Sequence, residues 1–186
     1  MQIRELAIKG AWISHSPTHT DNRGFFREWF KEEEVEIATG RSFTVHQANI
    51  STSNKGVLRG IHYSLANKGQ AKWITCISGS IWDVVVDIRP SSPTFKEWIG
   101  IELNALSDSS LFISEGLGHG FISLEDNSTV AYLLTSKYSP TEEFEIHPLD
   151  PELGIIWPLK NPSLSIKDAA APTLMQQLSA GRLLLK

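Results

Sequence analysis

Residues 57–88 read VLRGIHYSLANKGQAKWITCISGSIWDVVVDI, and this stretch decides the class of fold. It holds three extended segments rich in β-branched and aromatic residues, which we expect to be the strands Val57–Ser64, Ala71–Ser78 and Ser80–Ile88. Turn-forming residues separate these segments at Asn67-Lys68-Gly69 and at Ser78-Gly79. Short strands with turns at this spacing indicate a β-sandwich or a β-barrel.

The same pattern continues on both sides of this stretch, and helix signals are few. We expect two short helices, Lys31–Ala38 ended by Gly40 and Thr173–Ala180 with Gly181 just past its end. The remaining expected strands are Ile3–Ile8, Gly24–Phe30, Phe43–Ser51, Lys96–Leu103, Ser110–Ser114 and Thr129–Ser136. The sequence therefore predicts an all-β fold with a few short peripheral helices.

The length and composition fit one globular domain. The chain has 186 residues, of which 41% are hydrophobic and 20% are charged. Prolines between Pro140 and Pro172 indicate a C-terminal segment laid over the barrel rather than a second domain. We expect a single domain over residues 1–186, with a barrel core at roughly 20–145 and the C-terminal segment 146–186 packed over it.

Charge and cysteine content restrict the partners and the compartment. A net charge of −4 argues against a nucleic-acid partner. No apolar run approaches the roughly 20 residues that span a bilayer, and Met1–Lys9 lacks the apolar region of a secretory signal. Cys76 is the only cysteine, so no internal disulfide can form. We expect a cytoplasmic protein with no membrane partner.

Several polar residues stand where strand alternation predicts a barrel interior. Residues i and i+2 of a strand share a face, so Gln47 and Asn49 point the same way. Lys72 and Tyr132 each fall in line with apolar residues of their strands. Either Lys72 reaches the surface and Tyr132 is a hydrogen-bonded core phenol, or both side chains point into a lined cavity.

His62 belongs to the same group of strand residues. Strict alternation places Arg59 and His62 on opposite faces of the strand, so both can contact one ligand only if the alternation is interrupted. Gly60 is the natural place for the β-bulge that would interrupt it. A single histidine is more often structural than catalytic. What favours a site is that a whole set of polar residues lies on or beside strands of one small barrel: Gln47, Asn49, Arg59, His62, Lys72, His119 and Tyr132.

At these residues the sequence resembles the dTDP-4-dehydrorhamnose 3,5-epimerase family of the cupin superfamily. The resemblance implies a cupin-type jelly-roll β-barrel, a homodimer, no cofactor and no metal. One departure is Leu117-Gly118, where the family often has Phe and Ala before the histidine. The matching stretches follow the family order over nearly the whole chain: DNRGFFRE at 21–28, QANIS at 47–51, GVLRGIHY at 56–63, QAK at 70–72, DVVVDIR at 83–89, SPTF at 92–95, GHGF at 118–121, YSP at 138–140 and SIKD at 165–168.

The resemblance also implies an activity and a role for each matching residue. The activity is epimerisation of dTDP-4-dehydro-6-deoxy-D-glucose at C3 and C5 through enolates, giving dTDP-4-dehydro-L-rhamnose for dTDP-L-rhamnose biosynthesis. His62 would be the base, Tyr132 the acid, Asp168 the orienting partner of His62, and Lys72 the group facing the C4 oxygen. The implied substrate contacts are Arg23, Phe26, Glu28, Gln47, Asn49, Arg59, His119, Tyr138, Glu143 and Lys167.

This chemistry needs these residue types. Removing a proton beside a ketone leaves an enolate, whose charge must meet a preplaced donor or cation such as Lys72. A neutral histidine titrates near the operating pH, and a carboxylate on its far nitrogen fixes the tautomer. Asp168 is our assignment for that carboxylate, and Asp83 is the alternative. The phenol of Tyr132 keeps its proton at neutral pH.

Three alternative functions remain open from the sequence. A metal-dependent cupin would need more ligands than His62 and His119, because the expected His-x-His pair reads His62-Tyr63-Ser64, although a carboxylate could complete a triad. A sugar- or nucleotide-binding module would use the same barrel without catalysis. An epimerase that inverts only C3 or only C5 would use the same catalytic groups.

Overall fold

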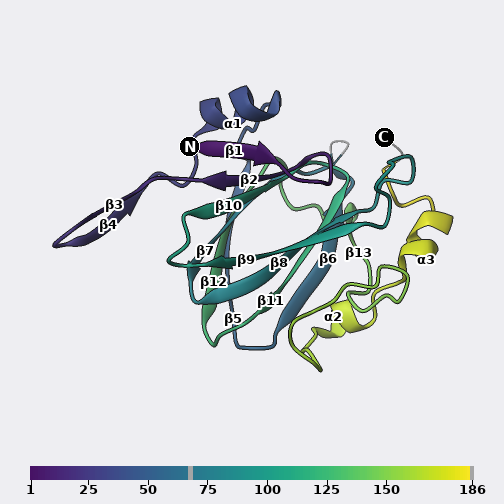
Figure 1. The fold of residues 1–186 in the computed structure, drawn as a ribbon. Coiled ribbons are helices and arrows are strands. Elements are labelled where there is room, and N and C mark those ends of the chain that lie inside the picture. The colour runs from purple at the N-terminus through teal and green to yellow at the C-terminus, as the bar shows by residue number, and fades with distance from the viewer. Residues whose placement is uncertain (67–68, 185–186) are drawn as a thin grey trace.

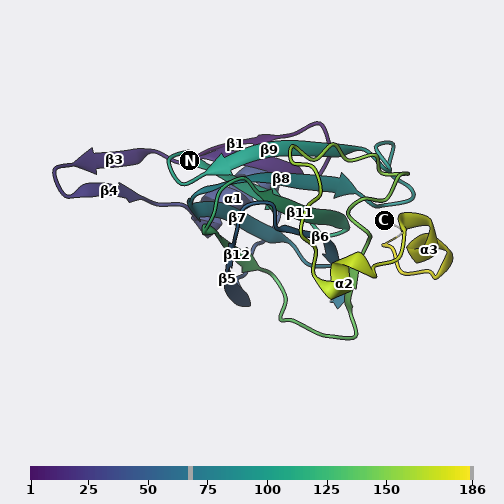
Figure 2. The same cartoon turned by 90° about the horizontal axis from the view of Figure 1, so that it is seen from below.

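Two antiparallel sheets face each other and form a jelly-roll barrel, from which a two-stranded arm projects (Figures 1 and 2). The computed structural model describes residues 1–66 and 69–184, so the expected turn at Asn67-Lys68 lies outside the described residues. A core of aliphatic side chains from both sheets fills the space between them, including Ile74 and Val130 from one sheet and Val85 from the other. The expected all-β class is therefore confirmed.

Among the described residues, the larger sheet has six strands and the smaller has five. In spatial order, the larger sheet consists of β1 (Gln2–Glu5), β2 (Ala11–His15), β10 (Ser109–Ile113), β7 (Lys72–Ser78), β12 (Ser128–Leu134) and β5 (Gln47–Ser53). The smaller sheet consists of β13 (Glu143–Glu145), β6 (Leu58–Ser64), β11 (Leu117–Ser123), β8 (Ser80–Asp87) and β9 (Trp98–Asn104). Because β1 and β2 belong to the larger sheet, the barrel begins before the expected residue 20.

The turn at Gly79 shows how the chain passes between the two sheets. Strands β7 and β8 are separated by this single residue, yet they lie in different sheets rather than pairing as a hairpin. Gly79 has φ of 69°, and a Cβ there would come 2.9 Å from the Ser128 Cα. Only glycine fits both the conformation and the space, so this sharp corner depends on it.

All of the expected strands are present with adjusted ends, but β2, β3, β11 and β13 were not predicted from the sequence. The segment at Phe43 is not strand, because that ring packs on Phe30 and Phe112 in a side cluster. Strand β11 contains Gly118 and Gly120, which lower its β propensity. Its tight packing requires them, since a Cβ on Gly120 would lie 2.8 Å from the Arg59 carbonyl oxygen.

Within the part of the chain that the structure describes, three short helices lie outside the barrel. Both predicted helices are confirmed, as α1 (Glu32–Thr39), which ends at Gly40 in the left-handed conformation, and α3 (Leu174–Ser179). A further single turn, α2 (Ile166–Ala169), was not predicted. The C-terminal segment carries α2 and α3, which lie on the side of the barrel where β6 and β13 are (Figure 1). Its apolar side chains pack against those of the smaller sheet. Among the described residues no helix is long and apolar enough to cross a membrane.

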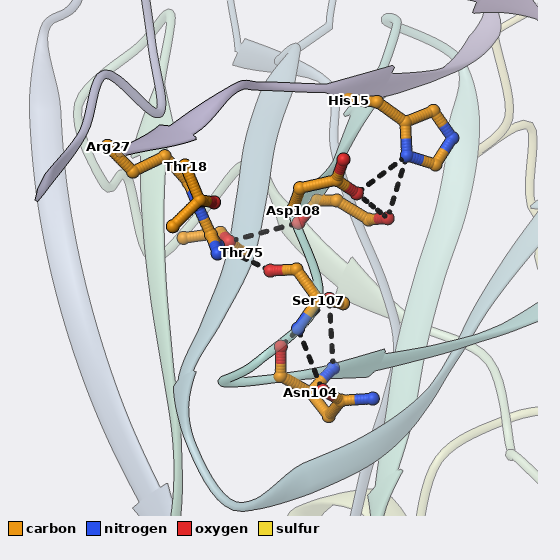
Figure 3. A network of polar contacts seen from close by, with 8 residues as sticks. His15, Thr18, Arg27, Thr75, Asn104, Ser107 and Asp108 are labelled. Atoms are coloured by element: carbon orange, nitrogen blue, oxygen red, sulfur yellow. Dashed lines mark hydrogen bonds and ion pairs between the residues drawn. The ribbon is translucent and has the colours of Figure 1, made fainter. Parts of the chain in front are cut away.

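The arm is a hairpin of β3 (Thr18–Asp21) and β4 (Gly24–Arg27) that extends away from both sheets (Figure 2). Its base is held by a polar network in which Arg27 donates to the Thr18 hydroxyl, at 2.8 Å, and to the Ser107 carbonyl oxygen (Figure 3). Next to it, His15 Nδ1 lies 2.8 Å from the Asp108 carboxylate. The arm is thus anchored at its base, while its strands are exposed.

Candidate active site

A cavity of about 520 Å³ opens between the two sheets at the end covered by the C-terminal segment. Strands β5, β7 and β12 of the larger sheet line one wall, and β6 with residues 163–168 lines the other. A second space of about 150 Å³, which we call the inner chamber, adjoins this cavity. The two spaces share four lining residues, namely Arg59, His62, Lys72 and Tyr132.

His62 and Asp168 form a pair between β6 and α2. His62 Nε2 lies 2.7 Å from Asp168 Oδ1, and the Asp168 side chain is buried while that of His62 is 41% exposed. Burial acts to raise the pKa of Asp168, but its contacts with His62 and the Ser165 hydroxyl outweigh burial and hold the pKa below its usual value. Asp168 is therefore charged at neutral pH, and as an acceptor beside Nε2 it fixes the orientation of the His62 ring.

Hydrogen bonds along the backbone bring Asp168 to His62 from far away in the sequence. Ser163 donates its N–H to the Gly56 carbonyl, at 2.8 Å, and accepts from the Leu58 N–H, at 2.9 Å. These bonds fix the C-terminal segment beside the start of β6. The single turn of α2 then places Asp168 over the histidine.

Tyr132 lies on β12 in the larger sheet, directly opposite Asn49 of β5 and Ile74 of β7. It lines both the main cavity and the inner chamber, as His62 does from the smaller sheet. The imidazole and the phenol therefore come from opposite walls of one space. Neither side chain is buried away from the cavity.

Lys72 is a buried cation on β7. The residue is 8% exposed, and its Nζ donates to the His62 carbonyl oxygen at 3.2 Å. Burial lowers the pKa of Lys72 to about 8, against the opposing charges of Glu143 and Asp83. Of the two interpretations of Lys72, the structure shows the side chain in the cavity rather than at the surface.

Asp83 pairs with His119 and not with His62. His119 Nε2 lies 2.8 Å from Asp83 Oδ2, and the carboxylate is completely buried. Burial lowers the pKa of His119 despite this partner, and the charges of Lys72 and His62 lower it further. The imidazole is neutral at neutral pH, so Nε2 donates to the carboxylate and Nδ1 is left as an acceptor in a side chain that lines the inner chamber.

The expected break of strand alternation at Gly60 is confirmed. The pairing register between β6 and β11 shifts between His119 and Phe121, opposite the segment from Arg59 to His62. Gly60 has φ of 128°, and a Cβ there would lie 2.5 Å from the Gly120 Cα. The bulge lets Arg59 and His62 line the same cavity.

The remaining polar lining residues surround the cavity mouth. Gln47 donates to Asn49 Oδ1 at 3.0 Å and accepts from the Tyr138 N–H at 2.8 Å, which ties the segment at Tyr138 to β5. Lys167 forms an ion pair of 2.8 Å with Glu145. The predicted residues that line the main cavity are Gln47, Asn49, Arg59, His62, Lys72, Tyr132, Tyr138, Glu143, Lys167 and Asp168.

Three predicted substrate contacts lie away from this cavity. Arg23 and Phe26 are on the projecting arm, where Arg23 pairs with Asp21 and Phe26 is 64% exposed. Glu28 follows the arm and pairs with Lys31. Within one copy of the chain, therefore, these residues do not join the site.

Sequence analysis missed several lining residues. Ser51 and Phe121 line the inner chamber, and Gln70 and Ser165 line the main cavity. Ser51 shares a strand face with Gln47 and Asn49, and Ser165 opens the quoted stretch SIKD, so both carried a usable signal. Gln70 carried none beyond its place beside Lys72.

The described residues contain no group of three or more His, Cys, Asp or Glu side chains arranged to hold a metal ion. His62 and His119 each use a ring nitrogen on a carboxylate instead.

A histidine–carboxylate pair that faces a phenol across one cavity defines a jelly-roll enzyme of the proton-transferring, epimerase class. The family profile described as dTDP-4-dehydrorhamnose 3,5-epimerase matches residues 5–176. The chain belongs to this family.

Individual relatives agree over nearly the full length. A dTDP-4-dehydrorhamnose 3,5-epimerase of Mycobacterium tuberculosis is 45% identical over 98% of this chain and 92% of its own. The structure of a Legionella pneumophila 3,5-epimerase in complex with dTDP-4-keto-L-rhamnose has a TM-score of 0.91, with 40% identity over 98% of this chain and 96% of that chain. A 3'-monoepimerase of Streptomyces bikiniensis in complex with dTDP-quinovose also scores 0.91, with 44% identity over 96% and 90%.

Proposed function

We propose that this chain epimerises dTDP-4-dehydro-6-deoxy-D-glucose at C3 and C5, giving dTDP-4-dehydro-L-rhamnose for dTDP-L-rhamnose biosynthesis. The observation that carries the proposal is the position of the His62–Asp168 pair and Tyr132 on opposite walls of one cavity. Inversion needs a base on one face of the carbon and an acid on the other. Family membership supplies the substrate class.

Each inversion is a balanced pair of proton transfers. Neutral His62 takes the proton from the carbon beside the C4 ketone, and the C–H electron pair moves into the carbonyl to form an enolate. The Lys72 ammonium stabilises the enolate oxygen, and charged Asp168 stabilises the imidazolium. Tyr132 then protonates the opposite face of the carbon. Exchange with water restores both groups before the second carbon reacts.

The other polar residues orient the substrate. The acceptor nitrogen of His119 suits a sugar hydroxyl, while Arg59 and Lys167 are cations placed for the diphosphate. Tyr138, exposed at the cavity mouth, is a surface on which the base can stack. Gln47, Asn49 and Glu143 complete the polar lining.

We also propose that the working form is a homodimer in which the arm of one copy completes the cavity of the other. An isolated two-stranded hairpin is only marginally stable in water, and this arm exposes Phe25 and Phe26 at 60% and 64%. The outer face of the larger sheet also exposes Ile50 and Ile77. A second copy would cover these surfaces and bring Arg23, Phe26 and Glu28 to a nucleotide-sugar.

Each copy would act as a single domain, because the C-terminal segment supplies both apolar cover for the smaller sheet and Asp168. A cytoplasmic location is consistent with the absence of any second cysteine.

A second candidate function is inversion of C3 alone. The S. bikiniensis 3'-monoepimerase has the same TM-score to this chain as the L. pneumophila 3,5-epimerase, so overall similarity does not separate the two activities. Both activities would use the same base and acid. The 3,5-epimerase activity requires that a second carbon of the sugar ring also reaches these two groups, whereas the C3 activity does not.

The decisive experiment is incubation of the purified protein with the 4-keto sugar nucleotide in heavy water, followed by NMR. Deuterium at both C3 and C5 with the L-rhamno product is the expected result. Deuterium at C3 alone establishes the second candidate, and no exchange at either carbon overturns both. A parallel reaction after chelation of metal ions should proceed at the same rate.

A further inference from the structure

We propose that Ser165 is a positioning residue for the epimerase reaction, the third member of a Ser165–Asp168–His62 chain that fixes the carboxylate behind the base. The inference rests on the proposed function, since it assigns Ser165 a part in the proton transfers made by His62. It concerns a residue that contacts the reacting groups only through Asp168.

Each neighbouring pair in the series Ser165–Asp168–His62 is in hydrogen-bond contact. The Ser165 hydroxyl donates to Asp168 Oδ2 at 2.9 Å, and Ser165 Oγ accepts the Asp168 backbone N–H at 3.0 Å. Asp168 Oδ1 meets His62 Nε2 at 2.7 Å. Each carboxylate oxygen therefore has its own partner, and the carboxylate plane cannot rotate without losing one of them.

Ser165 is also the N-cap of α2, and the two tasks are separable in chemistry. Capping needs an acceptor for the backbone N–H, whereas holding Oδ2 needs a hydroxyl hydrogen to donate. A serine or threonine provides both at once. An aspartate at this position would retain the cap and lose the donated hydrogen.

The second task matters because Asp168 is buried. The Asp168 side chain is 5% exposed, and the Ser165 hydroxyl is the donor that the protein itself supplies to Oδ2. Without that donor the charged carboxylate is less favoured and the pKa of Asp168 rises. Oδ1 then also attracts the imidazole proton more strongly, so both effects move the loss of activity on the acid side to higher pH.

The test compares Ser165→Ala, Ser165→Asp and Ser165→Thr with a matched control, Thr173→Ala. Thr173 caps α3 by the same side-chain bond to the third residue of its helix, and it does not line the cavity. We expect Ser165→Ala and Ser165→Asp to lower kcat by about tenfold or more with little change in KM. Their acid limb of kcat/KM should move to higher pH. Ser165→Thr and Thr173→Ala should keep both the rate and the profile of the wild type.

Two outcomes overturn the proposal. In one, Ser165→Ala has wild-type kcat and pH profile. In the other, Ser165→Asp is fully active, which shows that the residue acts only as a helix cap. A wild-type protein that exchanges no sugar proton refutes the proposed function instead, so failure of the function is distinguished from failure of the role given to Ser165. Circular dichroism of each variant verifies that the fold is retained.

Discussion

Replacing Lys72 by Met should make the protein more stable and nearly inactive. Methionine has a similar length and fills the same space without a charge. Burial lowers the Lys72 pKa from 10.5 to about 8, and each tenfold change in proton affinity corresponds to about 1.4 kcal/mol. Keeping the ammonium in the cavity therefore costs about 3 kcal/mol at neutral pH. The variant also loses the hydrogen bond to the His62 carbonyl, which lowers its stability by about 1 kcal/mol. The free energy of unfolding of Lys72→Met should therefore exceed that of the wild type by about 2 kcal/mol.

The sign of the pH dependence follows from linkage. Between the folded pKa of about 8 and the unfolded value of 10.5, the unfolded chain binds more protons than the folded one. The wild type should therefore become more stable as pH rises through this window, relative to Lys72→Met, and the advantage of the variant should be lost above it. The advantage of the variant is fully present below about pH 8.

Urea unfolding at about pH 7 and about pH 10 measures this difference, and the sugar-exchange assay measures activity. Activity should fall at least about a hundredfold, because the enolate loses its cation. Lys96→Met is the matched control, since Lys96 forms an exposed ion pair with Glu152 whose loss changes stability by no more than about 1 kcal/mol. A Lys72→Met protein that is less stable than the wild type at neutral pH, or that remains active, would refute the reasoning.

Further predictions concern the base, the acid, the second histidine pair and the arm. His62→Ala and Tyr132→Phe should each lose at least about a hundredfold in turnover while folding normally, and near-normal turnover in both would reject their roles. In the wild type, kcat/KM should fall as pH rises through about 8, where Lys72 loses its proton, and a profile that is flat to about pH 10 would contradict this. Asp83→Asn should raise KM more than it lowers kcat, because the amide no longer holds the His119 tautomer that accepts from the substrate; an unchanged KM would count against that contact. Refolding an equal mixture of the inactive His62→Ala and Arg23→Ala proteins should restore up to about a quarter of wild-type activity, since a mixed dimer has one intact site if the arm crosses to its partner. No recovery would show that the arm does not cross.

Local sequence signals predicted much of the secondary structure. The β-branched segments between turn residues correctly indicated most strands, and Gly40 marked the end of α1. The predictions failed where tertiary packing overrode propensity. Strand β11 needs glycines against its neighbour β6, and β13 has only three residues that pair because β6 offers an edge.

For the candidate site too, local signals predicted some features and only the tertiary structure revealed others. Alternation placed Gln47 and Asn49 on one face, and Gly60 identified the bulge that brings Arg59 and His62 together. Local spacing alone left Asp83 as an alternative to Asp168 as the partner of His62, because both are distant along the chain; the resemblance favoured Asp168, and that carboxylate is the one that meets His62. The sequence could not show that the serine opening the stretch SIKD holds a carboxylate.

The sequence by itself determined the strand-rich class, the position of the bulge and the set of residue types able to move protons, because these depend on local propensity and spacing. Only the tertiary structure decided which histidine pairs with which carboxylate, and that the base and the phenol stand on opposite sheets. It also placed the arm outside its own cavity. These features depend on contacts between segments up to 106 residues apart, whose geometry no local pattern contains.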